Sequence, residues 1–157
     1  MTQTTKFIYK LGIPNFMKQI SREDYLRAIY VIYEAQKDKK EGIKSVDIAK
    51  HLNVSKASVS EMVRKLAKEG YIAVRPYSAI QFTKKGLSEA RRIMHNHRVI
   101  EVFLKKILNY NINKVHEEAH RLEHAFSEGS INRLDKFLKN PKISPHGYPI
   151  PRYKRRS

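Results

Sequence analysis

Residues 45–70 read SVDIAKHLNVSKASVSEMVRKLAKEG, and this stretch decides the fold of the first half of the chain. A short helix is predicted over 45–52, with Ser45 as its N-cap and its apolar residues on one side. Residues 53–55 form a tight turn, and a second helix is predicted over 56–68, before a Glu-Gly stop. Two helices of this length joined by a three-residue turn are typical of a helix-turn-helix.

A β-hairpin is predicted directly after this motif. Short runs of β-branched and aromatic residues at 71–75 and 80–83 predict two strands around a turn at 76–79. A helix-turn-helix followed by a hairpin is the winged-helix arrangement. Upstream, a helix is predicted to start at Ser21 as N-cap, with residues 1–20 as an N-terminal arm.

The second half of the chain is predicted to be helical. Apolar periodicity predicts a long helix from about residue 84 to 108, and two shorter helices follow. The fold class is therefore mainly α, a winged helix-turn-helix domain followed by an all-helical domain. The expected boundaries are an arm over 1–20, a DNA-binding domain over 21–91, a helical domain over 92–151 and a basic tail over 152–157.

The amino-acid composition limits the kinds of molecule that the protein is expected to bind and the kinds of site that it can form. The formal charge is +17, from 32 Lys and Arg against 15 Asp and Glu. Such an excess opposes the compact state and is typical of proteins that bind a polyanion. The lack of cysteine excludes disulfides, thiolate zinc fingers and cysteine nucleophiles. Neither a membrane span nor a secretory signal is predicted, so we expect a basic cytoplasmic protein.

The outer face of the predicted helix 56–68 carries side chains suited to DNA. Its N-terminus can bind a phosphate, Glu61 lies where base edges are read, and Arg64 can reach a phosphate or a guanine. The alternative is a solvated charged face, but the basic charge and the following hairpin favour double-stranded DNA. The predicted contacts are Ser55, Lys56, Ser58, Ser60, Glu61, Arg64 and Arg75.

Five of the seven histidines fall within residues 95–124. His116, His120 and His124 follow one another at intervals of four, and Glu123 lies three residues after His120. Residues 120, 123 and 124 therefore share one face of a predicted helix over 113–126. Imidazoles one turn apart can bind one metal ion, and a neighbouring carboxylate completes the set.

A second pair of the same kind, His97 and Glu101, lies on the preceding helix. The two helices together predict a metal cluster of three His and two Glu, with His116 at its edge. The alternative is a set of ordinary surface ion pairs. Residues 120–124 also match the H-x-x-E-H signature of inverted zinc peptidases, but too little chain follows for a substrate-enclosing body, so an enzyme is not expected.

Several segments resemble the diphtheria toxin repressor and manganese transport regulator family, whose members are iron- or manganese-activated transcriptional repressors. The resemblance implies a winged-helix domain, a helical dimerisation domain and two metal sites near their junction. Because the sequence ends at Ser157, we expect the two-domain form, without the SH3-like domain of iron-type members. The matching segments are DYLRAIY at 24–30, His97-Arg98 with Glu101, INKVHEEAHRLEH at 112–124 and SPHGYPIP at 144–151.

The resemblance also implies ligands for two metal sites. The primary site would comprise Asp24, His120, Glu123 and His124, and the ancillary site His97, Glu101 and His116. In manganese-type members the histidine that matches His97 instead joins a binuclear cluster.

At the positions of Asp24 and His120, the combination of residues matches neither family pattern. Iron-type members carry Met and Cys at the positions of Asp24 and His120, and manganese-type members carry Asp and Glu. This chain has Asp and His, and it has Arg27 where manganese-type members have a further Glu ligand.

The sequence thus predicts a metal-dependent repressor that binds palindromic operator DNA as a homodimer and controls metal homeostasis genes. Fe(II) or Mn(II) is the expected cofactor, with Zn(II), Co(II) and Ni(II) as substitutes. Neither a membrane nor a small-molecule substrate is expected as a partner. The alternative is a winged-helix regulator whose His/Glu cluster is a structural zinc site or binds no metal. The expected dimer surface comprises Val102, Phe103, Leu104, Phe126 and Leu134.

Overall fold

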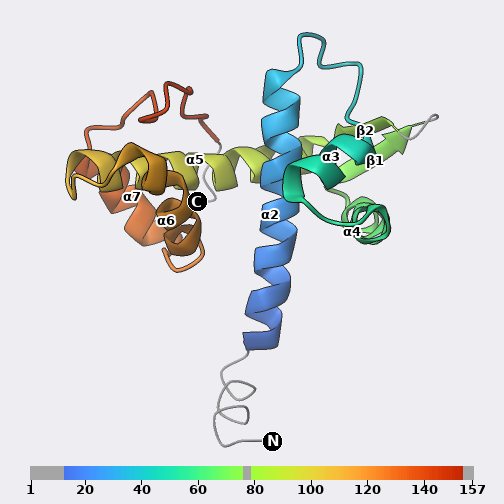
Figure 1. The fold of residues 1–157 in the computed structure, drawn as a ribbon, viewed down its shortest axis with the longest axis horizontal. Coiled ribbons are helices and arrows are strands. Elements are labelled where there is room, and N and C mark those ends of the chain that lie inside the picture. The colour runs from blue at the N-terminus through green and yellow to red at the C-terminus, as the bar shows by residue number, and fades with distance from the viewer. Residues whose placement is uncertain (1–12, 76–78, 154–157) are drawn as a thin grey trace, which may run out of the picture. The chain divides into compact units, whose positions relative to one another are not determined.

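A computed structural model of the chain describes residues 13–75 and 79–153, and of residues 13–21 it describes the backbone alone. The chain divides into two compact units, Met1–Gly86 and Leu87–Ser157 (Figure 1). None of the helices in the described ranges is long and apolar enough to cross a membrane.

The first unit is a winged helix, as predicted. It contains α2 (Ile13–Ala35), α3 (Ser45–Leu52) and α4 (Lys56–Lys68), followed by β1 (Ile72–Arg75) and β2 (Ala79–Phe82). α2 packs against both α3 and α4, so the helix-turn-helix rests on a long supporting helix (Figure 1). The buried apolar side chains of this unit include Leu26, Ile29, Ile48, Val59, Leu66 and Ile80.

The predicted hairpin is present. β1 and β2 are antiparallel, with Ile72 opposite Phe82, and the strand bounds lie within about one residue of the prediction. Ile43 extends the sheet, because its N–H donates to Ile80 O at 2.8 Å and its own carbonyl accepts from Ile80 N at 2.9 Å. The sheet is therefore joined to the residues that lead into α3. Most of the predicted turn falls on residues 76–78, outside the described residues.

The predicted start of the first helix was wrong. α2 begins at Ile13, so Ser21 lies inside the helix and is not its N-cap. Pro14 is the second residue of α2, a position at which its missing N–H has no helical partner to lose. Residues 13–20 of the expected arm are thus helical, and residues 1–12 lie outside the described range.

The helix-turn-helix is defined by local backbone conformations. The N-cap of α3 is Lys44, without a side-chain cap, so the prediction of Ser45 as N-cap was wrong. Asn53 ends α3 in the left-handed region, with φ 53°, a common way for a helix to end before a sharp turn. Ser55 then caps α4 by accepting a hydrogen bond from Ser58 N at 3.1 Å.

The second unit is formed by α5 (Lys84–Lys106), α6 (Ile112–Glu123) and α7 (Glu128–Phe137), with α5 starting in the first unit. Asn111 caps α6 by accepting from Asn113 N at 3.0 Å. The core of this unit consists of Ile100, Leu104, Val115, Ala119 and Ile131.

A C-terminal segment packs on the same unit after α7. Its Ile150 is buried against Val99 and Val102 of α5. Val102 and Leu104 are each 1% exposed within the chain, so the prediction that they form a dimer surface was wrong. Their apolar surface is already used inside their own unit.

The junction between the hairpin and α5 is unusually tight. Thr83 Oγ1 accepts a hydrogen bond from Gly86 N at 3.0 Å and donates to Gly70 O at 2.7 Å. A Cβ atom at Gly86 would lie 1.7 Å from Tyr71 O. Only glycine therefore allows the first turn of α5 to approach the end of the hairpin so closely.

We expect Gly86→Ala to destabilise the protein by about 3 kcal/mol, because the new methyl group overlaps backbone that cannot move without displacing the hairpin. Denaturant unfolding of both proteins at one concentration measures the difference. Gly129→Ala is the control, since its Cβ would meet only Ser127 Oγ at 3.8 Å. A Gly86→Ala protein as stable as the control would contradict this account.

Candidate functional site

Three predicted ligands gather between α5 and α6. His97 and Glu101 come from α5 and His116 from α6, and one ligand atom of each lies within 4.8 Å of the other two. His97 Nε2 is 3.1 Å from Glu101 Oε1 and 3.0 Å from His116 Nδ1, and His116 Nδ1 is 3.2 Å from the same oxygen. His116 thus contributes a nitrogen to this group, while its side chain stays 65% exposed.

A second group forms at the C-terminal end of α6. His120 Nδ1 donates to Glu123 Oε1 at 2.8 Å, and His124 Nε2 is 3.5 Å from that oxygen. The helix ends at Glu123, earlier than predicted, and His124 is its C-cap. His124 nevertheless keeps a helical backbone, so its ring lies 5.3 Å from that of His120.

Glu123 joins the two groups. While its Oε1 faces His120 and His124, its Oε2 accepts a hydrogen bond from His97 Nδ1 at 2.7 Å. A carboxylate that fixes a histidine through one ring nitrogen leaves the other nitrogen oriented for a metal ion. The His97 Nε2 atom, which faces Glu101 and His116, is oriented in this way.

The electrostatics of the first group follow from burial and pairing. Burial lowers the pKa of His97, but hydrogen bonds to Glu101 and Glu123 and their negative charge outweigh it, so this pKa is raised. Burial favours the neutral form of Glu101, yet hydrogen bonds from His116 and His97 lower its pKa to about 2. The group therefore holds ionised oxygen beside imidazole nitrogen, a donor set that suits divalent transition metals.

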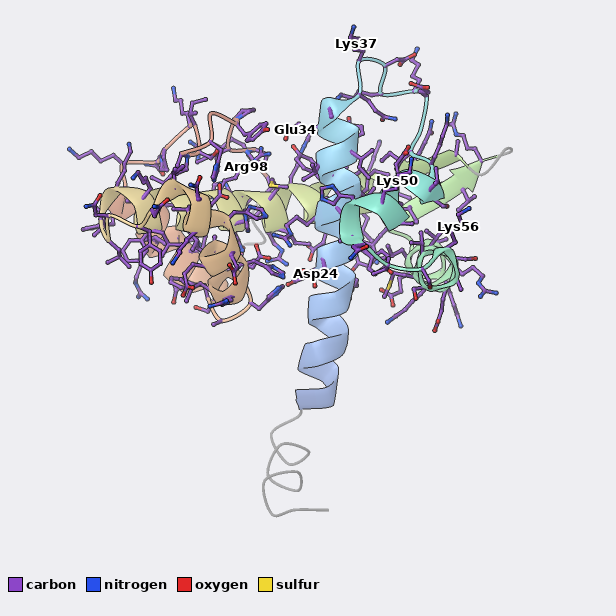
Figure 2. The ribbon with its side chains drawn as sticks, viewed as in Figure 1. Asp24, Glu34, Lys37, Lys50, Lys56 and Arg98 are labelled. Atoms are coloured by element: carbon purple, nitrogen blue, oxygen red, sulfur yellow. The ribbon has the colours of Figure 1, made fainter. Side chains whose placement is uncertain are left out.

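Asp24 lies in the other unit. It is half-buried on α2, and its Oδ1 is 3.6 Å from Arg27 Nη2 (Figure 2). Because α2 begins at Ile13, Asp24 is well inside the helix and cannot cap its N-terminus. Its role as a metal ligand stays a prediction.

His146 was missed by the sequence analysis. Its Nε2 lies 4.0 Å from Glu101 Oε1, the same oxygen that faces His97 and His116. Helical spacing relates His97 to Glu101 and relates His116, His120 and His124 to one another, but no such spacing relates His146 to any of them. Only the packing of the C-terminal segment brings it to the group.

The predicted DNA-contacting residues all lie in the first unit and are all exposed. α4 buries Val59, Val63 and Leu66 and leaves its opposite face to solvent. Lys56 at its start is exposed, as is Lys50 on α3 (Figure 2). The seven predicted residues are all exposed, on α4, its N-cap and the end of β1: Ser55, Lys56, Ser58, Ser60, Glu61, Arg64 and Arg75.

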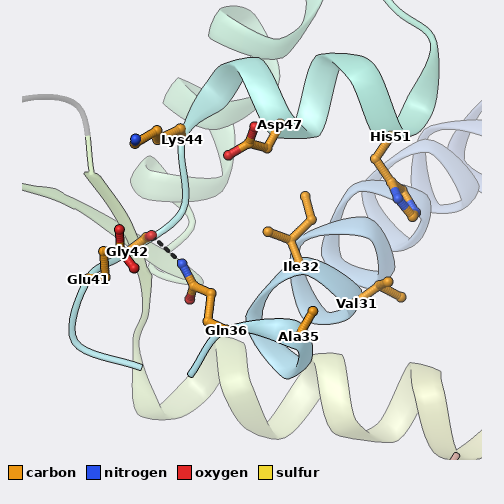
Figure 3. Close-up of a pocket in the computed structure, with 9 residues that line it drawn as sticks. All are labelled: Val31, Ile32, Ala35, Gln36, Glu41, Gly42, Lys44, Asp47 and His51. Atoms are coloured by element: carbon orange, nitrogen blue, oxygen red, sulfur yellow. Dashed lines mark hydrogen bonds between the residues drawn. The ribbon is translucent and has the colours of Figure 1, made fainter. Parts of the chain in front are cut away.

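A surface pocket of about 450 Å³ lies between the end of α2 and α3 (Figure 3). Ile32 lines its α2 side, and Asp47 and His51 line its α3 side. Gln36 Nε2 donates to Gly42 O at 2.5 Å beside it. The lining residues include neither the predicted metal ligands nor the predicted DNA contacts, so this pocket is separate from the candidate site.

Sequence comparison identifies both units. Residues 17–80 match the family model described as the iron-dependent repressor N-terminal DNA-binding domain, and residues 83–152 match the metal-binding and dimerisation domain of the same family. The chain belongs to the iron-dependent repressor family. Members of this family are transcriptional repressors. The predictions of family and of a winged helix with a helical dimerisation domain are confirmed.

Relatives of the chain include iron-dependent and manganese-dependent repressors. An uncharacterized HTH-type transcriptional regulator of Methanocaldococcus jannaschii is 38% identical, with 78% of this chain and 95% of the relative covered. The diphtheria toxin repressor of Corynebacterium diphtheriae is 38% identical over 82% of this chain and 55% of its own. A manganese-dependent transcriptional repressor in complex with manganese has a TM-score of 0.75 and 35% identity, covering 83% of this chain and 58% of that one.

The repressor chain spans about half the length of the diphtheria toxin repressor that it matches. Within the chain, each matched domain contains one of the two candidate binding sites. The exposed face of α4 falls in the DNA-binding match, and the two His/Glu groups of the second unit fall in the metal-binding match.

We expect Glu123→Gln to weaken metal binding by at least about 10-fold, because Glu123 contacts histidines of both groups. Competition with a metallochromic chelator measures the affinity. Glu117→Gln is the matched control on α6, since Glu117 is exposed and pairs with Arg121 instead. Equal affinities of the two variants would show that the Glu123 carboxylate is not needed for the metal.

Proposed function

We propose that this protein is a metal-dependent transcriptional repressor that binds palindromic operator DNA as a homodimer and controls metal homeostasis genes. One observation carries the proposal. In a chain of the iron-dependent repressor family, one unit exposes a polar recognition helix and the other gathers six His and Glu side chains into two groups. A repressor acts where the DNA is, which places the protein in the cytoplasm.

The metal in this proposal is Fe(II) or Mn(II), with Zn(II), Co(II) or Ni(II) as substitutes. His97, Glu101 and His116 would hold one ion, and His120, Glu123 and His124 would hold another with Asp24. A bound divalent ion supplies the positive charge that keeps these carboxylates and imidazoles together. Mixed nitrogen and oxygen ligands accept several first-row ions, so the donor set does not select among them.

Asp24 is the residue through which we propose that metal binding controls DNA binding. It belongs to α2, against which α3 and α4 pack, whereas the other proposed ligands belong to the second unit. A carboxylate of the first unit on the same ion as imidazoles of the second would fix the DNA-binding unit relative to the dimerisation domain. Metal would then shift the population toward the DNA-competent arrangement.

The DNA-binding mode follows from the winged helix. One unit presents one recognition helix, α4, and can contact one half-site. Two copies related by a two-fold axis would contact two half-sites of opposite orientation, which makes the operator palindromic. The match to a dimerisation domain supports this arrangement.

The proposal is tested by titrating fluorescently labelled operator DNA with the protein, with Mn(II) or Fe(II) and with chelator, and following anisotropy. We expect tight binding only with metal. Arg64→Ala should weaken metal-activated binding and reduce the log–log salt slope by about one unit, because an exposed Arg64 on α4 would lose a phosphate contact. Arg133→Ala, an exposed arginine on α7, is the control.

Equal DNA affinity with metal and with chelator would reject the metal-dependent repressor. It would favour a winged-helix regulator whose His/Glu groups are structural or unused.

We expect Asp24→Asn to raise the metal concentration for half-maximal DNA binding on the order of 10–100-fold, because the amide lacks the charge that a divalent ion prefers. The metal-free protein should keep its thermal stability. Asp38→Asn, an exposed carboxylate in the loop after α2, is the control. A wild-type metal response of Asp24→Asn would show that Asp24 does not couple metal to DNA.

A further inference from the structure

A basic residue, Arg27, lies beside the proposed metal ligand Asp24 on α2. The two residues are three positions apart, so their side chains project from the same face of the helix. Arg27 Nη2 is 3.6 Å from Asp24 Oδ1, an ion pair within the first unit. The carboxylate that is proposed to bind metal is thus already paired with a cation.

This ion pair is partly shielded from water. The side chains of Arg27 and Asp24 are 13% and 24% exposed, so water and salt screen their charges less than those of an open surface pair. The separation of 3.6 Å is longer than a hydrogen bond. Charge therefore holds these two atoms together, and another cation can replace Arg27 without breaking a hydrogen bond between them.

The position of Arg27 opposes a metal ion on Asp24. An ion bound to Oδ1 at about 2.2 Å would lie no more than about 6 Å from Nη2. An imidazole can release a proton when metal arrives, but a guanidinium keeps its charge at every physiological pH. The ion must therefore displace Arg27 from Asp24 or bind close to its positive charge, and either event raises the metal concentration that is needed.

We propose that Arg27 acts through Asp24 as a competitor of the metal ion and so sets the metal concentration at which the protein binds DNA. The inference rests on the proposed function in one respect, that Asp24 is a metal ligand. When metal is scarce, the permanent charge of Arg27 would keep Asp24 paired within α2. When metal is abundant, the ion would take the carboxylate from Arg27, and the DNA-binding unit would be joined to the dimerisation domain.

A supporting role of Arg27 predicts a change of the opposite sign. An arginine that only orients Asp24 for the ion, or only stabilises α2, should weaken metal binding when it is replaced. A competitor should strengthen metal binding when its charge is removed. The direction of the change therefore separates the two roles.

The test uses the full chain. Mn(II) affinity is measured by competition with a metallochromic chelator, and the Mn(II) concentration for half-maximal operator binding is measured by anisotropy. We expect Arg27→Gln and Arg27→Met to improve both on the order of 10-fold, because each removes one nearby positive charge. Arg27→Lys keeps the charge and should stay within about threefold of the wild type. Arg22→Gln is the matched control, since Arg22 lies on the same helix but pairs with Glu69, at 3.7 Å.

A double-mutant cycle with Asp24→Asn tests whether Arg27 acts through Asp24. In the Asp24→Asn background we expect Arg27→Gln to change Mn(II) affinity by less than about threefold, because no carboxylate is left to compete for. A gain as large as in the wild-type background would show that Arg27 acts independently of Asp24. Denaturant unfolding in chelator confirms that each variant is folded.

Unchanged or weaker Mn(II) binding by folded Arg27→Gln and Arg27→Met, beside a wild-type protein that responds to Mn(II), overturns this inference and leaves the proposed function intact. If the wild type and every variant bind operator DNA equally with Mn(II) and with chelator, the metal-dependent function fails and this inference fails with it.

Discussion

The pairing of two buried carboxylates with histidines is the interaction on which the second unit depends. Glu101 and Glu123 are 3% and 8% exposed, and a buried charge is tolerated only where partners compensate for its lost hydration. His97 supplies a partner to both, through Nε2 to Glu101 and through Nδ1 to Glu123. These contacts compensate for the buried charge. They also hold α5 and α6 in one register and bring together the donor atoms for a metal ion.

A cluster of this kind is suited to a switch. Without metal, ring N–H groups of the histidines donate hydrogen bonds to the carboxylates. A metal ion would take the ring nitrogens as ligands and so would replace protons among partners that are already in place. Little rearrangement is then needed within the group itself. The response can be transmitted by a segment that contributes a single ligand, which we propose to be α2 through Asp24.

The contacts within the DNA-binding unit make it rigid. Its sheet is tied to the start of α3 through Ile43 and Ile80, and its hairpin is locked to α5 by Thr83 and the close approach of Gly86 to Tyr71. These contacts hold α4 on a fixed base, with its polar face exposed. A recognition helix fixed in this way can be moved only as part of the whole unit, as the proposed control of half-site spacing requires.

Local sequence patterns were sufficient to predict much of the structure of this protein. The helix-turn-helix, the hairpin and the set formed by His120, Glu123 and His124 could be predicted because neighbours within a helix or strand follow from its period. The start of α2 could not be predicted, because a serine followed by acidic residues has the sequence of an N-cap even where it lies inside a helix. Only the tertiary structure decided that Glu123 contacts His97, that His116 contacts His97 and Glu101, and that His146 lies near Glu101. Contacts between segments depend on how the cores pack, and no local spacing encodes that packing.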